Sequence, residues 1–321
     1  MNLKHIILML AAGLLTACSQ DEPSFPTEGV EGPLPEGQYP LVLTASIGTS
    51  TRATVDDTWD GTETVYVQIV DNYTEGQTYT WSEPIACTVA ANGELTFPTD
   101  ETPYWIKNTE HKLIRAWWRG DNSSSLESNF SVRTNQSDRA GYAASDFVLA
   151  QDELAFEGDG DGTTLSFYHQ VAKVRLNIKN DNISASEYLT AVYLSTNTCY
   201  QGAYTPPVDV KSDYGNWSSN PSWCSQIVMR SRSSSTEEYK GSYEAIVIPQ
   251  TKSGGDDVFY IQISDYQLDN FVYEAPDDFT WKPGYVYTYD VTVKPTGLEV
   301  ETNESIDNWD AGSSGSGSVE I

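Results

Sequence analysis

Apolar and polar residues alternate in short runs along most of the chain, and turn-forming residues separate the runs. In the run at residues 171–178, Val174, Leu176 and Ile178 fall on one face, with Lys173 and Arg175 on the other. A period of two is typical of a β-strand with one buried face. The same alternation predicts strands at residues 65–70, 94–97, 113–118, 146–150, 164–167, 189–194, 243–248, 258–263, 270–273 and 285–293. No segment has a sustained helical period, so the pattern predicts an all-β chain of two antiparallel β-sandwiches.

An earlier run at residues 39–47 has the same alternation. Its predicted inward-facing residues are Tyr39, Leu41, Leu43, Ala45 and Ile47. Pro40 restricts this strand to a sheet edge or a strand start, because proline donates no hydrogen bond to a ladder. Residues 48–54 follow as small and mostly polar residues around Arg52, which predicts an accessible loop.

The N-terminal sequence predicts a targeting segment. Residues 1–17 contain Lys4 and then a ten-residue apolar stretch that is too short to span a bilayer, so we expect a signal peptide that is removed. The sequence Leu15-Thr16-Ala17-Cys18 fits the bacterial lipobox, in which the cysteine sulfur receives a lipid and the leader is cut before it. The alternative is an ordinary signal followed by a chance cysteine. Residues 18–38 are rich in Pro, Gly and acidic residues and predict a flexible linker.

An acidic run at residues 157–162 suggests the break between two domains. We expect an N-terminal sandwich over residues 39–170 and a C-terminal sandwich over residues 171–321 that ends in a flexible tail. The run resembles the start of a calcium loop, but its twelfth position is Tyr168 instead of glutamate, which favours an acidic turn. Residues 120–144 and 205–238 contain few apolar residues and are predicted to be long loops.

Composition limits the chemistry that this chain can perform. It has 321 residues, with 18 Lys and Arg against 46 Asp and Glu, and its net charge of −28 argues against a nucleic-acid binder. It has three histidines and no H-E-x-x-H, G-x-S-x-G or Walker A pattern, so we expect no catalytic site, no metal site and no cofactor. His169 is expected in the core or an interface, and His111 on a solvated turn.

Cysteines and tryptophans leave further alternatives open. Cys199 and Cys224 are near enough in sequence to form a disulfide, although isolated buried thiols fit equally, and Cys87 has no evident partner. Exposed indoles can stack on sugar rings, and buried ones pack between sheets. The tryptophans considered for either role are Trp105, Trp117, Trp118, Trp217 and Trp223. Since Trp117 and Trp118 alternate in direction, one of the two should be partly exposed or covered by a loop.

Four sequence features together resemble the fimbrillin family of Bacteroidetes, the lipoprotein precursors of pili and of their minor and tip subunits. They are the lipobox, Thr51-Arg52-Ala53-Thr54 followed by Trp59, Asp146-Phe147-Val148-Leu149-Ala150 followed by Leu165-Ser166-Phe167-Tyr168-His169-Gln170-Val171-Ala172-Lys173-Val174, and residues 281–289 followed by Gly297, Leu298, Ile306 and Trp309. Each motif is common alone, but their order and spacing are specific and cover nearly the whole mature chain. The tract Gln20-Asp21-Glu22 also resembles the signal that directs lipoproteins of this phylum to the cell surface.

The resemblance implies two tandem transthyretin-like antiparallel β-sandwich domains and assembly by strand exchange. Residues 39–51 would fill a groove in the N-terminal domain until a trypsin-like protease cuts between Arg52 and Ala53, and a strand of another fimbrial subunit would then replace them. The alternative is a solvated Arg52 that is never cut. Further implied partners are a host protein or glycan receptor and, through the lipid anchor, the outer membrane.

The C-terminal tail bears on the subunit's place in a fimbria. Residues 311–318 consist of Ala, Gly and Ser, a linker composition that makes a poor donor strand. This favours an accessory or tip subunit of a surface fimbria that accepts a strand without donating one. A function of a different class is the alternative: a surface-exposed glycan-binding lipoprotein that does not polymerise.

Overall fold

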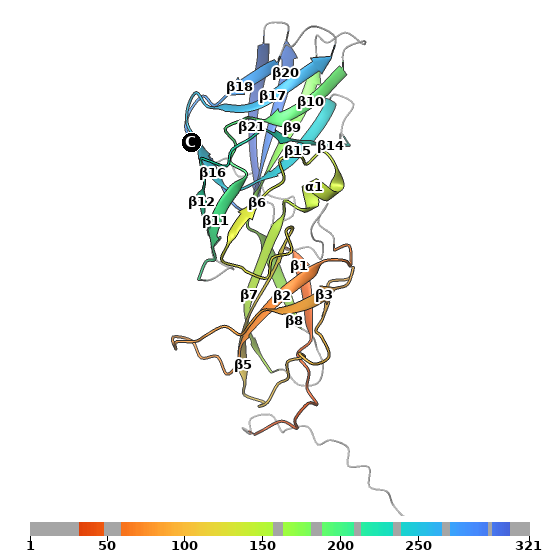
Figure 1. Ribbon diagram of the computed structural model, residues 1–321, viewed down its shortest axis with the longest axis vertical. Coiled ribbons are helices and arrows are strands. Elements are labelled where there is room, and N and C mark those ends of the chain that lie inside the picture. The colour runs from red at the N-terminus through yellow and green to blue at the C-terminus, as the bar shows by residue number, and fades with distance from the viewer. Residues whose placement is uncertain are drawn as a thin grey trace, which may run out of the picture.

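A computed structural model describes residues 32–47, 59–156, 163–180, 188–208, 213–233, 239–264, 270–294 and 297–308. The described chain is almost entirely β-structure, which confirms the all-β prediction. It forms two bodies stacked along the long axis of the molecule (Figure 1), and the sheet that contains β1 to β5, β7 and β8 makes up the lower body. The predicted signal peptide, Cys18, Arg52, Ala53, the acidic run 157–162 and the tail from residue 309 lie outside the described residues.

The lower body is a closed barrel of seven strands. In spatial order these are β1 (Leu43–Ile47), β4 (Glu94–Thr96), β3 (Ile85–Val89), β2 (Thr64–Val70), β5 (His111–Arg119), β7 (Phe147–Ala155) and β8 (Thr163–His169). Neighbouring strands are antiparallel except for β1 and β8, which are parallel. The sandwich expected for this half of the chain therefore has its two layers joined into one sheet, with β1 as the closing strand.

The upper body is a sandwich of two larger sheets. One contains, in order, β14 (Arg230–Arg232), β15 (Tyr239–Val247), β9 (Ala172–Asn180), β20 (Tyr285–Lys294) and β21 (Gly297–Asn308). The other contains β13 (Ile227–Val228), β10 (Tyr188–Leu194), β17 (Asp257–Ser264) and β18 (Asn270–Glu274). Val174, Leu176 and Ile178 from β9 lie in one buried cluster with Phe259 and Ile261 from β17, so the two sheets pack face to face.

Two smaller sheets and one short helix complete the fold. They are β6 (Asn129–Ser131) with β11 (Gln201–Thr205) and β12 (Asn216–Ser219), β16 (Gln250–Lys252) with β19 (Phe279–Trp281), and α1 (Arg139–Ala143). The prediction of long loops at residues 120–144 and 205–238 is therefore wrong in part, because these regions contain β6, α1, β12, β13 and β14. Strands of two to four residues are too short to produce a readable alternation.

The segment between β5 and β7 links the two bodies. Its strand β6 pairs with β11, and Leu126, Phe130 and Tyr142 lie in the hydrophobic core of the upper body. The chain thus leaves the barrel at the end of β5, contributes to the second core, and returns to the barrel as β7. The boundary expected near residue 171 does not separate these contacts. No helix in the described part of the chain is long and apolar enough to span a membrane.

Candidate functional site

The backbone of β1 is hydrogen-bonded within the barrel on both sides. Leu43 lies opposite Leu95 of β4 and Thr163 of β8, and Ala45 lies opposite Leu165 of β8. The amide of Thr163 donates to the carbonyl oxygen of Val42 at 3.1 Å. Without β1, both β4 and β8 would present unpaired backbone groups.

The apolar side chains at every second position of this segment lie in the barrel core, and Ser46 between them is also buried. Leu41, Leu43, Ala45 and Ile47 are each at most 4% exposed, whereas Val42 is 39% exposed. Tyr39 is partly buried, and its ring meets the edge of Phe156 at 5.4 Å between ring centroids. We call the slot between β4 and β8 that residues 39–47 fill the first-strand groove.

The residues just before β1 also lie against the barrel. Leu34 is buried, and its amide donates to the carbonyl oxygen of Ile106 at 2.9 Å. The amide of Leu41 donates to Pro103, and the carbonyl oxygen of Tyr39 accepts from Trp105. Residues 32–38, which were predicted to belong to the flexible linker, thus contain an ordered anchor. One apolar residue among prolines and acids gives no periodic signal by which sequence could have identified it.

Trp59, which the sequence indicated only as part of a family motif, and Gly93, which it did not indicate, hold β1 at Ala45. The indole Nε1 of Trp59 donates to the carbonyl oxygen of Ala45 at 3.2 Å, and the Ala45 amide donates to the carbonyl oxygen of Gly93 at 2.7 Å. Gly93 has φ +87°, and a Cβ placed there would lie 2.3 Å from the Ala45 oxygen. The Asn92-Gly93 dipeptide is a hairpin-turn signal, but nothing local indicates that this turn touches β1.

The predicted processing site lies in the stretch that joins β1 to Trp59. β1 ends at Ile47, and Trp59 is the next residue that the structure describes. Arg52 and Ala53 lie between these two residues, outside the described ranges. Trp59 itself is buried and packs edge-on against Trp118 and Phe167 of the barrel core. The ends of this stretch are therefore fixed on the barrel on both sides.

The structure brings Cys199 and Cys224 together as a disulfide across an isolated β-bridge. Cys87 is a buried thiol, and burial followed by the charge of Glu101 raises its pKa to about 12. A thiol with so high a pKa is almost never a thiolate at neutral pH, which makes it unreactive.

His169 and His111 lie in different environments, one buried and one solvated. His169 is fully buried, and its Nδ1 lies 2.9 Å from Oδ1 of the equally buried Asp146. The pair joins the end of β8 to the residue before β7, which fits the expected core histidine. His111 is solvated, but it begins β5 and pairs with Glu153 at 2.6 Å, so its predicted place on a turn is wrong. Within the described ranges, no three His, Cys, Asp or Glu residues cluster as metal ligands.

The predicted difference between Trp117 and Trp118 is found. Trp118 lies in the barrel core, whereas Trp117 belongs to the core of the upper body and its Nε1 donates to the carbonyl oxygen of Ser123 in a covering loop. Trp105 is also buried. Trp223 is 45% exposed and is the one of these tryptophans that is open to a sugar ring.

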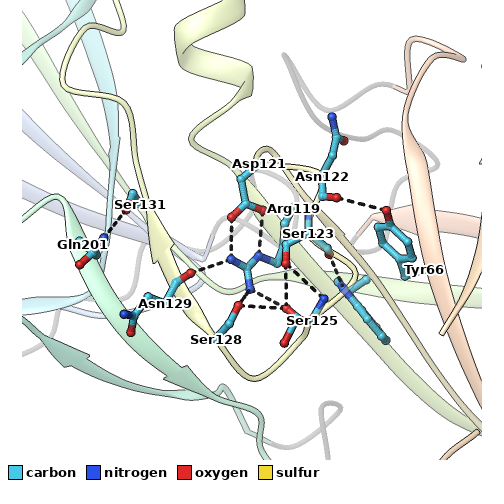
Figure 2. Close-up of polar contacts among 11 residues, drawn as sticks. Tyr66, Arg119, Asp121, Asn122, Ser123, Ser125, Ser128, Asn129, Ser131 and Gln201 are labelled. Carbon is cyan, nitrogen blue, oxygen red and sulfur yellow. Dashed lines mark hydrogen bonds and ion pairs between the residues drawn. The ribbon is translucent and has the colours of Figure 1, made fainter. Parts of the chain in front are cut away.

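A buried arginine organises the loop that covers Trp117. The guanidinium of Arg119 pairs with both carboxylate oxygens of Asp121 and donates to the carbonyl oxygens of Ser125 and Asn129 and to the hydroxyl of Ser128. Figure 2 shows the guanidinium surrounded by these partners at the base of the loop. The loop leads directly into β6, where Ser131 accepts a hydrogen bond from Gln201. Arg119 therefore fixes the segment that joins the barrel to the upper body.

The buried Lys252 in the upper body should make the unfolding free energy depend on pH. Its side chain is 1% exposed and donates to the turn at Asn197, and burial lowers its pKa to about 8 against the opposing charges of Asp256 and Asp257. Between pH 8 and 10 the unfolded chain holds more protons than the folded one, so Lys252 makes the folded state more stable as pH rises. We expect the unfolding free energy of the wild type, relative to Lys252→Met, to rise by about 2 kcal/mol across this window in denaturant titrations. The exposed Lys240→Met should show no such trend, and a flat Lys252 difference would contradict the assignment.

Comparisons with known proteins agree with this architecture. Residues 51–309 match the model of the fimbrillin-like family. A proposed cell adhesion protein from Bacteroides ovatus aligns with 17% identity and a TM-score of 0.61 over 84% of this chain and 97% of its own. A similar protein from Bacteroides uniformis aligns with 17% identity and a TM-score of 0.59 over 86% and 100%.

A fimbrial protein from Bacteroides vulgatus aligns with 11% identity and a TM-score of 0.51 over 84% of this chain and 99% of its own. No curated relative matches the sequence. At these identities the solved structures establish the shared fold, whereas the family model covers most of the chain. The chain therefore belongs to the fimbrillin-like family.

Proposed function

We propose that this protein is an accessory or tip subunit of a cell-surface fimbria, exported as a lipoprotein precursor and assembled by strand exchange after proteolysis. The observation that carries the proposal is the position of β1. It closes the barrel, it inserts the side chains of Leu43, Ala45 and Ile47 into the core, and the chain that connects it to Trp59 contains Arg52.

The physical basis is the state left behind when β1 departs. The barrel would then have an apolar slot between β4 and β8 whose backbone groups lack partners. Water can satisfy the backbone groups but not the apolar wall, whereas a strand with alternating apolar residues satisfies both. A strand of another fimbrial subunit is the natural replacement, and a cut at Arg52 frees β1 to leave.

The lipobox that ends at Cys18 and the acidic tract after it support lipidation and export to the outer surface of the outer membrane. A cut at Arg52 would also separate the body from that anchor, so that retention would pass from the lipid to the fimbria. The Gly- and Ser-rich tail supports a subunit that accepts a strand without donating one. A host protein or glycan receptor fits such a position at the end or side of a fimbria.

The proposal predicts a defined N-terminus for the mature surface protein. N-terminal sequencing of assembled protein should find a start at Ala53, and Arg52→Ala should instead leave a chain that begins at lipidated Cys18 and does not enter fimbriae. The matched control is Arg133→Ala, which removes an exposed arginine in the segment that follows β6 and should be processed like the wild type. Finding intact, lipidated Cys18 in all of the assembled wild-type protein would overturn the proposal.

A further inference from the structure

The contacts around Ala45 differ from those along the rest of β1. Elsewhere the strand is held by ladder bonds to its neighbours, but Ala45 is also held by a side chain, the indole of Trp59. Its amide donates to Gly93, and the turn at Gly93 approaches so closely that a side chain there would overlap the Ala45 oxygen. A strand in this groove is therefore fixed at one defined residue.

The alternation of side chains sets the register of the strand, and these contacts hold the backbone at Ala45. A slip by one residue would turn Thr44 and Ser46 into the barrel and the apolar residues outward, because side chains alternate with a period of two. The Ser46 hydroxyl lies at 3.5 Å from the carbonyl oxygen of Leu165 on β8, at the edge of hydrogen-bond distance. Trp59 and Gly93 thus hold the backbone of Ala45, while its small side chain is buried in the barrel.

Packing limits the size of the residue at this point. Ala45 is 2% exposed, and its inward neighbours Leu43 and Ile47 are equally buried. Trp59 is 3% exposed and lies edge-on to Phe167 at 5.7 Å between ring centroids. A tightly packed interior of this kind resists added methylene groups, typically by about 1–3 kcal/mol.

We infer that the site at Ala45, where Trp59 and Gly93 hold the backbone and the packed barrel core limits the side chain, determines which donor strand can replace β1. The inference rests on the proposed function and specifies its partner. The accepted strand has large apolar residues at the positions of Leu41, Leu43 and Ile47, and a small residue with a free N–H at the position of Ala45. A proline there would lack the donor to Gly93, and a large side chain would not fit.

This chain's own last described strand does not meet the requirement. Along β21, alternate positions hold Leu298, Val300, Thr302, Glu304 and Ile306. The opposite set contains Glu299, Glu301 and Asp307. In either direction a groove-length stretch of β21 would bring a carboxylate or several polar residues into the barrel core, which is costly. The groove therefore selects a strand of a different subunit and excludes β21 of a second copy.

Peptide exchange into the cut protein tests the inference. Full-length protein is nicked at Arg52 by limited trypsin digestion, and labelled peptides spanning residues 39–47 compete for the groove, followed by fluorescence anisotropy and native mass spectrometry. The wild-type peptide and its Val42→Leu variant, which adds bulk at the outward position, should bind within about twofold of each other. The Ala45→Leu peptide should bind about tenfold or more weakly.

The outcomes separate the inference from the proposed function. Equal binding of the Ala45→Leu and Val42→Leu peptides would overturn the selectivity while leaving strand exchange intact. If no peptide enters the nicked protein, strand exchange fails and the inference fails with it.

A protein variant tests the role of the indole donor. Trp59→Phe keeps an aromatic ring but removes the donor to Ala45, and should weaken binding of the wild-type peptide about fivefold, the value of one hydrogen bond. Trp81→Phe, in a loop on the outside of the barrel, is the matched control and should leave the affinity unchanged. An unchanged affinity for Trp59→Phe would remove Trp59 from the selection.

Discussion

Replacing Leu43 with aspartate is expected to destabilise the N-terminal barrel by about 4 kcal/mol or more. Leu43 is fully buried at the point where β1 meets both β4 and β8. The variant loses the apolar contacts of leucine, which are worth about 2–5 kcal/mol in a core, and puts a carboxylate where no described cation can pair with it. A loss of this size removes much of the stability of a typical domain.

Urea unfolding of the uncut chain measures this effect, and the neighbouring position supplies the control. Val42→Asp places the same charge one residue away on the outward face, where the side chain is 39% exposed, and should cost less than about 1 kcal/mol. Equal stability of the two aspartate variants would contradict the closing role assigned to β1.

Removing the Arg119 side chain is expected to loosen the connection between the two bodies. In Arg119→Met the carbonyl oxygens of Ser125 and Asn129 lose their donor, and Asp121 loses a bidentate partner. Breaking a buried ion pair from one side costs about 3–5 kcal/mol, and partial hydration of Asp121 places the expected loss near 3 kcal/mol. Limited proteolysis should then cut within residues 120–131, next to β6, before the rest of the chain.

Two other arginine variants make this prediction specific. Arg139→Met breaks an exposed ion pair with Asp60 and should cost under about 1 kcal/mol without exposing the loop. Arg119→Lys keeps the charge but loses the planar guanidinium with its several donors. Its unfolding free energy should therefore lie between those of the wild type and Arg119→Met. Similar unfolding free energies for Arg119→Met and Arg139→Met would show that the network in Figure 2 does not hold the bodies together.

Some of this architecture can be read from short stretches of sequence. The alternation at residues 65–70, 113–118 and 171–178 corresponds to β2, β5 and β9. The long strands are readable because burial on one face imposes its period on consecutive residues. The family could likewise be predicted from the sequence, because its motifs are short segments that occur in a fixed order.

Other elements escaped because their signals are short or absent. β3 (Ile85–Val89) presents only Cys87 and Val89 as fully buried residues, and β6 and β12 to β14 have four residues or fewer. Leu34 anchors the approach to β1 from within a segment that is otherwise typical of a linker. In each case the stabilising partner is remote, and the residues themselves carry no periodic pattern.

By itself the sequence determined that this is a β-protein of the fimbrillin-like family and that residues 39–47 alternate like a strand. It also determined that the side chains of Trp117 and Trp118 point in opposite directions. The tertiary structure decided that β1 closes a barrel between β4 and β8, that Trp59 and Gly93 meet at Ala45, and that Arg119 ties the barrel to the upper body. The division has a physical cause. Alternation follows from the environment of consecutive residues, whereas closure joins strands separated by more than a hundred residues and depends on which edges meet in space.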